Sequence, residues 1–277
     1  MKKLILTAAI ASSVVFANAQ DMMSKKGTPI LPEAGDWSIG FEVGPYLGNL
    51  FNGSNNNNGL SSQIPNTLVG LYVVDANTAY RAKFRLGFGS KTHNNLVDQD
   101  GSSTTPPAQV TDEWKSSSMN VTLGFGIQKS RGKGRLHGIY GVEAMIGLGS
   151  GKVTNSYGNP FSTTQTSPNS TTWNSAGVEV AEGGLSSRPT EEKAGSTFNF
   201  GLNGFIGAEY FFAPKMSVSA EYGWGLTMSS TGEGSSTDEY WDLTSSSVKT
   251  ASGKTGKSSS FGLDVIDGGS LTLHLYF

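Results

Sequence analysis

The first residues of this sequence that could do chemistry are charged side chains at alternate positions of otherwise apolar segments. Arg81, Lys83 and Arg85 stand two residues apart, so an extended backbone places all three on one face. Glutamates occupy comparable places in other segments: Glu42, Glu143, Glu209 and Glu221. Charges enclosed by a protein wall need partners, because an unpaired buried charge is costly. The pattern predicts an interior network of ion pairs, and the alternative interpretation is a path or gate for ions.

Histidine offers a second kind of chemistry, since an imidazole beside a nucleophile can act as a general base. The chain has three histidines. His93 is followed by Asp98 and Asp100, whereas His137 and His274 fall at segment ends that are expected to face the other way. Nothing in the spacing fixes the geometry of a catalytic triad. We therefore expect His93 to be a solvent-exposed loop residue, and we expect no catalytic residue.

Two clusters combine acidic and aromatic side chains, at residues 112–114 (Asp-Glu-Trp) and 238–242 (Asp-Glu-Tyr-Trp-Asp). They are compatible with binding of calcium, a sugar or a protein partner, and equally with soluble loop residues whose aromatic rings fold over neighbouring structure. Neither cluster has the regular ligand spacing of a calcium loop, which favours the interpretation as soluble loop residues. The chain has no cysteine, which excludes thiolate zinc sites and disulfides. We expect no metal ligand and no cofactor-binding residue.

The first residues have the pattern of an export signal. Lys2 and Lys3 begin it, an apolar run follows, and a small-x-small motif ends it at Ala19. The apolar run is too short for a membrane-spanning helix, which needs about 20 residues. We expect a signal peptide at 1–19 and one mature domain at 20–277. The net charge of −2 gives no electrostatic reason to expect binding of nucleic acid.

The elements that must position these side chains are β-strands, because apolar and polar residues alternate with period two through much of the chain. Tyr80, Phe84 and Phe88, for example, alternate with the three basic residues and with glycine. The expected strands are 36–47, 66–74, 79–90, 117–129, 135–150, 196–211, 215–229 and 268–277. Of these, the span 66–74 is apolar on both faces, so its phase is left open.

The connections between these spans alternate between short and long. Tight turns alternate with long segments rich in serine, threonine, asparagine and glycine, at 48–65, 91–116, 151–195 and 230–267. Bacterial outer-membrane barrels have this connectivity, and a strand of about 9–11 residues suffices to cross the bilayer. The sequence predicts an all-β, transmembrane, antiparallel up-and-down barrel of about eight strands. The long external loops are too polar to be predicted as packed structure.

Aromatic residues gather near the ends of the expected strands. Amphipathic rings prefer the headgroup zone of a bilayer, so these residues predict two aromatic girdles. One girdle contains Trp37, Tyr80, Tyr210, Phe211, Phe212 and Tyr276, and the other contains Tyr46, Phe88 and Trp224. The alternative is the ordinary preference of aromatic residues for strands.

The alternating strands, the signal and the last segment together resemble small outer-membrane barrels of the OmpA/OmpX-like type, in a form common in Bacteroidota. In the last segment, Leu271, Leu273 and Leu275 alternate with polar residues and Phe277 ends the chain. The resemblance implies that this segment is a sorting strand read by the barrel-insertion machinery. It also implies a place in the outer membrane of a Gram-negative bacterium, in contact with lipid and lipopolysaccharide.

These features favour a protein without enzymatic activity. The leading hypothesis is a structural barrel or an accessory subunit of a larger outer-membrane complex, because a filled polar interior is combined with long external loops. A narrow pore for ions or small solutes is the alternative. A third hypothesis is an envelope enzyme that modifies lipids or peptides.

Overall fold

The computed structural model describes residues 23, 24, 26–43 and 67–277, except for the side chains of 264–268. The predicted signal peptide at 1–19 lies outside the described residues, as do the expected loop at 48–65 and Tyr46 of the predicted girdle. The described chain is all-β, as predicted. Its strands are β1 (Trp37–Glu42), β2 (Thr67–Asp75), β3 (Thr78–Asp98), β4 (Gln109–Lys133), β5 (Leu136–Ser156), β6 (Asn169–Trp173), β7 (Glu179–Gly184), β8 (Ser187–Lys193), β9 (Thr197–Ala213), β10 (Met216–Thr231), β11 (Gly234–Asp242), β12 (Ser247–Thr255) and β13 (Ser258–Tyr276).

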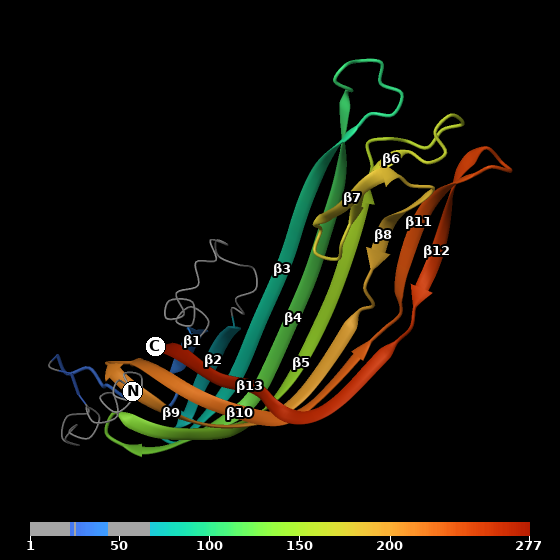
Figure 1. Cartoon of the computed structure of the whole chain (residues 1–277). Helices are drawn as coiled ribbons and strands as arrows, with labels where there is room; N and C mark the ends of the chain where they lie inside the picture. The colour runs from blue at the N-terminus through green and yellow to red at the C-terminus, as the bar shows by residue number, and fades with distance from the viewer. Residues whose placement is uncertain (1–22, 25, 44–66) are drawn as a thin grey trace, which may run out of the picture.

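These strands form two antiparallel sheets, one of 11 strands and one of two (Figure 1). Within the larger sheet, eight strands pair in a circuit that returns to its start, in the order β1, β2, β3, β4, β5, β9, β10 and β13. The circuit closes where β1 pairs with β13, with Ile39 opposite Leu275. Where β1 and β2 take part, this closure satisfies the backbone groups on both edges of each strand. Nearer the head, β3 beyond Arg85 and β13 before Leu271 are paired on one edge among the described residues.

Among the residues that the structure describes, no helix is long and apolar enough to span a membrane.

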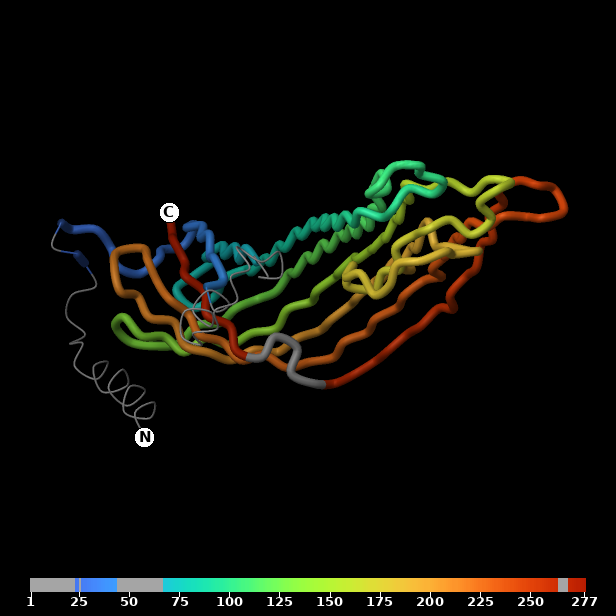
Figure 2. Tube along the Cα trace, turned by 45° about the horizontal axis from the view of Figure 1, so that its top comes forward, coloured from blue at the N-terminus to red at the C-terminus, as the bar shows by residue number. Residues whose placement is uncertain are grey.

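The rest of the larger sheet extends beyond the circuit at one end. Together with the β6–β7 hairpin, it makes up residues 90–117, 150–195 and 232–257, which we call the head. In the head the strand order is β12, β11, β8, β5, β4 and β3. The β6–β7 hairpin lies across this sheet, and β6 contacts both β3 and β4 (Figure 1). The described residues before β1 lie together with the C-terminus at the end opposite the head (Figure 2).

The structure corrects the expectation that the long connections are unpacked loops. The described residues contain thirteen strands, and the segments expected as loops at 91–116, 151–195 and 230–267 are largely extended and paired. β3 and β4, for instance, remain paired from Thr78 opposite Lys129 out to Asp98 opposite Gln109. Polar residues on both faces of these extensions hid the period-two signal. The backbone ladder and the β-propensity of threonine nevertheless favour strands there.

Candidate functional site

The circuit of strands buries polar side chains and exposes apolar ones, the inverse of a water-soluble core. Phe125 and Val142 point outward with 65% and 64% of their surface exposed, while Glu143 next to Val142 is 3% exposed. β2, whose phase the sequence left open, places Val69 and Leu71 inside, where both apolar side chains are buried. The interior of the circuit is therefore the place where the predicted charges meet.

Arg81 is the centre of the interior charges. Its side chain on β3 reaches Glu221 on β10, with Nη1–Oε1 at 2.9 Å and Nη2–Oε2 at 2.7 Å. In the circuit, β3 and β10 are four strands apart in either direction, so this bidentate pair crosses the full width of the interior. Arg81 is 3% exposed and Glu221 8% exposed, so the pair is shielded from solvent.

Glu143 on β5 joins this pair to a second cation. One of its oxygens lies 3.2 Å from Nε of Arg81, and the other accepts a hydrogen bond of 2.8 Å from Lys83. Gly126 on β4 lies opposite Glu143, and a Cβ at Gly126 would stand 2.7 Å from the Cβ of Glu143. A glycine at this position therefore leaves the room that the carboxylate needs. Phe205 stacks beneath the guanidinium of Arg81, 4.5 Å from its ring centre.

The other predicted interior charges have separate places. Glu42 and Arg85 line a cavity of about 100 Å³ together with Arg81 and Lys83, on the head side of the cluster. Glu209 is 3% exposed and accepts hydrogen bonds from the hydroxyls of Ser217 and Tyr276. The predicted network therefore divides into a central cluster of Arg81, Lys83, Glu143 and Glu221, a polar cavity, and a glutamate held by hydroxyl groups.

The end of the circuit opposite the head is filled by an apolar plug. Ile30, which precedes β1, is 1% exposed and packs with residues of four strands. The other members of the plug are Leu71, Val73, Ala79, Phe211 and Tyr276. Phe211 and Tyr276 were predicted to lie in a lipid-facing girdle. For these two residues the prediction is wrong, because both rings are buried inside the circuit. Position near a strand end does not tell which face a ring occupies, whereas the pleat does.

The histidines occupy three different environments. His274 is buried between the hydroxyls of Ser38 and Ser219, at 3.2 and 3.3 Å. His137 lies edge-on to Phe211. His93 was expected in a loop, but it lies within β3, and its ring packs edge-on against Trp114 with centroids 5.7 Å apart. Of the acidic residues that follow His93 in the sequence, Asp100 has another partner.

Asp100 accepts the backbone N–H of Asn169 at 2.9 Å. It belongs to a polar core that holds the β6–β7 hairpin on the head. At its centre Asp112, with 0% exposure, accepts the backbone N–H groups of Gly158 (2.8 Å) and Thr171 (2.7 Å). Arg188 on β8 donates to Ser170 at 2.8 Å. The 112–114 cluster, interpreted from sequence as soluble loop residues, is therefore a buried anchor for the hairpin.

The second acidic and aromatic cluster, at 238–242, lies in β11. Asp242 at its end accepts hydrogen bonds from Ser245, Lys249 and the backbone of Thr244. These hydrogen bonds lower the pKa of Asp242 well below its usual range, and the ion pair raises the pKa of Lys249. The carboxylate thus closes the β11–β12 hairpin.

The last strand has the predicted alternation. Leu275 and Phe277 are exposed on the outer face, whereas Thr272, His274 and Tyr276 are buried inside. Leu271 and Leu273 share the outer face by the same alternation. The sorting role of Leu271, Leu273, Leu275 and Phe277 remains a prediction.

No family model matches this chain. No curated protein and no solved structure gives a significant match either.

Proposed function

We propose that this protein is an eight-stranded transmembrane β-barrel of a Gram-negative outer membrane, with a closed interior, and that it anchors the head outside the cell. The observation that carries the proposal is the inverted burial around a closed circuit of strands. Outward rings such as Phe125 and Trp224 would otherwise face water on every strand, at a high cost. A closed, outwardly apolar sheet is the β-architecture that a bilayer accepts.

The interior supports an anchor in preference to a pore. The pair between Arg81 and Glu221 joins opposite walls, and the apolar plug around Ile30 fills the end opposite the head. An ion crossing the barrel would have to displace both, and separating a buried ion pair costs several kcal/mol, roughly 3–5. We therefore regard the narrow pore as the weaker hypothesis, and we assign the barrel no enzymatic role.

The partners follow from this proposal. The outer face would contact outer-membrane lipid, and the base of the head would lie among lipopolysaccharide. The barrel-insertion machinery would read the last strand, which ends in Leu275 and Phe277. The head leaves surface for a role as an accessory subunit of a larger outer-membrane complex.

The membrane placement is tested with single-tryptophan variants in vesicles of brominated lipid. Trp224 lies on the outer face of β10 and is 51% exposed, and Trp241 lies in β11 of the head. Each variant keeps one of the two and carries phenylalanine at every other tryptophan. We expect strong quenching of Trp224 and little quenching of Trp241. Equal quenching of both, or an unquenched Trp224, would contradict the membrane barrel.

The closed interior is tested by planar-bilayer recordings of the purified wild-type chain. We expect no conductance steps above background. Regular steps in the wild-type protein would favour the pore, and the membrane placement would then stand while the anchor function would not.

A further inference from the structure

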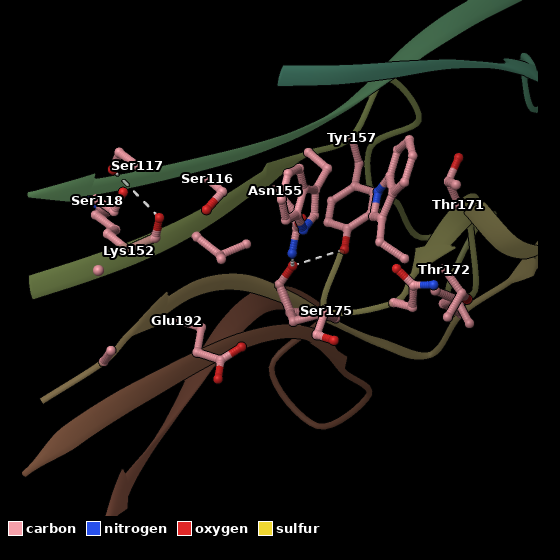
Figure 3. Close-up of a pocket in the computed structure, with 18 residues that line it drawn as sticks. Ser116, Ser117, Ser118, Lys152, Asn155, Tyr157, Thr171, Thr172, Ser175 and Glu192 are labelled. Carbon is pink, nitrogen blue, oxygen red and sulfur yellow. Dashed lines mark hydrogen bonds between the residues drawn. The ribbon is translucent and has the colours of Figure 1, made fainter. Parts of the chain in front are cut away.

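A pocket in the head lies between the large sheet and the β6–β7 hairpin with its connecting segments. Its volume is about 440 Å³, within the usual range for sites that bind small ligands. In Figure 3, Ser117, Ser118 and Lys152 stand at one end of the pocket and Tyr157 and Thr171 at the other. The sheet strands β4 and β5 form one wall, and the segment around Trp173 and Ser175 forms another.

Three aromatic side chains line this pocket: Trp114, Tyr157 and Trp173. The turn after β6 covers the ring of Trp114, since a Cβ at Gly177 would come within 2.4 Å of it. Lys91 holds that turn by donating to the carbonyl of Ala176 at 3.1 Å. The aromatic wall is therefore fixed by contacts within the protein, which limits the entropy lost when a ligand binds.

The polar lining is rich in uncharged groups. Hydroxyls and amides come from Ser116, Ser117, Ser118, Asn155, Thr171, Thr172, Asn174 and Ser175. Two of the lining residues carry a buried polar atom without a hydrogen-bond partner among the described residues: Asn155 Oδ1 and Trp173 Nε1. Asn155 is fixed in this orientation, because its Nδ2 donates to the carbonyl of Pro189 at 2.9 Å. The wall thus offers one unpaired acceptor and one unpaired donor.

The charges of the pocket are balanced. Lys152 is the lining cation and is paired with Glu191 at 2.6 Å, while Glu192 is the lining anion. The Tyr157 hydroxyl is protonated at neutral pH, as in any ordinary tyrosine, and burial raises its pKa further, an effect that Arg188 only partly opposes. A charged ligand would find no net attraction here. A neutral ligand with apolar faces and groups that both donate and accept would meet all of these features.

We propose that this pocket binds a neutral carbohydrate. Sugar hydroxyls both donate and accept, so they can satisfy Asn155 Oδ1 as well as Trp173 Nε1 after a small adjustment of the wall. The C–H faces of a pyranose ring are apolar and flat, which suits contact with aromatic rings. The inference goes beyond the anchor function, and it stands whether or not the barrel spans a membrane.

The test is titration calorimetry and tryptophan fluorescence on the full-length protein in mild detergent. One arm uses maltotriose, cellotriose and chitotriose as free oligosaccharides. The other arm uses lipid-free O-polysaccharide from outer-membrane lipopolysaccharide. We expect saturable binding in one of the arms, and the arm that binds identifies the source of the sugar. An uncharged Ala-Ser hexapeptide serves as the control ligand. The proposal would be overturned if neither sugar arm bound, or if only the hexapeptide bound.

Two variants locate the binding site. Trp173→Ala is expected to lower the affinity by about tenfold or more, through the lost ring contact and hydrogen bond. Trp241→Ala removes a tryptophan of the head outside the pocket lining and is expected to leave the affinity unchanged. Ala194 lines the pocket and its side chain is exposed. Ala194→Phe therefore places a large ring in the pocket without removing a contact of its wall. If Ala194→Phe binds sugar as the wild type does, the pocket is not the site.

Discussion

Arg81 on β3 and Glu221 on β10 lie 140 residues apart in the chain and form a bidentate ion pair across the centre of the closed circuit of strands. Neither partner can turn to solvent, because both are buried and Glu143 holds the third side of the guanidinium. The pair therefore links opposite walls, and its energetic role is measurable.

Arg81→Met is expected to destabilise the protein by about 3–5 kcal/mol, because the buried carboxylate of Glu221 loses its bidentate partner and Glu143 loses one of its two cations. The double variant Arg81→Met/Glu221→Gln should recover part of that loss. Urea unfolding in lipid vesicles, followed by tryptophan fluorescence, measures both. Lys254→Ala is the control, because its ion pair with Glu233 is exposed and should contribute little. If the losses of unfolding free energy from Arg81→Met and Glu221→Gln, each measured alone, add up to the loss of the double variant, the two residues are not energetically coupled.

Phe125→Arg tests the outer face of the circuit by unfolding in the same vesicles. An arginine facing the middle of a bilayer costs about 2–4 kcal/mol, and we expect a loss of that size. Val180→Arg is matched to it, since Val180 in β7 of the head is 64% exposed and Phe125 is 65% exposed. Val180→Arg should leave stability unchanged. A tolerated arginine at Phe125 would mean that its ring faces water.

Asp112→Ala is expected to loosen the head and leave the circuit of strands intact. The buried carboxylate accepts two backbone N–H groups, and a hydrogen bond to a charged group contributes about 1.5–3 kcal/mol. Hydrogen exchange should accelerate at residues 158–184 and remain slow in β9 and β10. Glu179→Ala, an exposed substitution in the same hairpin, is the control. Faster exchange throughout the circuit would argue against an independent head.

Asp36→Asn tests the ion pair with Lys215 at the end opposite the head. Burial raises the pKa of Asp36, but hydrogen bonds from Lys215 and from the backbone of Glu33 outweigh it, and the pKa is lowered. A lowered carboxyl pKa stabilises the folded state above the unfolded pKa of about 3.9, and this stabilisation is lost as the pH falls through the folded value. The wild type should exceed Asp36→Asn in urea midpoint at pH 7, and the difference should shrink below about pH 4. A difference that persists unchanged at pH 2 would rule out titration of Asp36 as its cause.

The alternation of residues by itself determined the all-β fold, the positions of strands such as β3 and β10, and the interior face on which Arg81 and Glu221 lie. It could do so because the pleat sends successive side chains to opposite faces, a property of the local backbone. Sequence could not say which cation meets which glutamate, because closure of the circuit brings together strands that are remote in the chain.

The head and the plug were decided by tertiary structure alone. Head strands such as β11 are polar on both faces. They are held in place by backbone hydrogen bonds between strands, and these leave no period-two pattern in the sequence. From the sequence Asp112 is expected to be a solvent-exposed acid, whereas in the structure it is buried and accepts the backbone N–H of Thr171. From the sequence Phe211 is expected to be a lipid-facing aromatic residue at a strand end, whereas in the structure it packs with Ile30 inside the circuit. Each of these depends on a contact between distant segments, and only the folded chain brings those segments together.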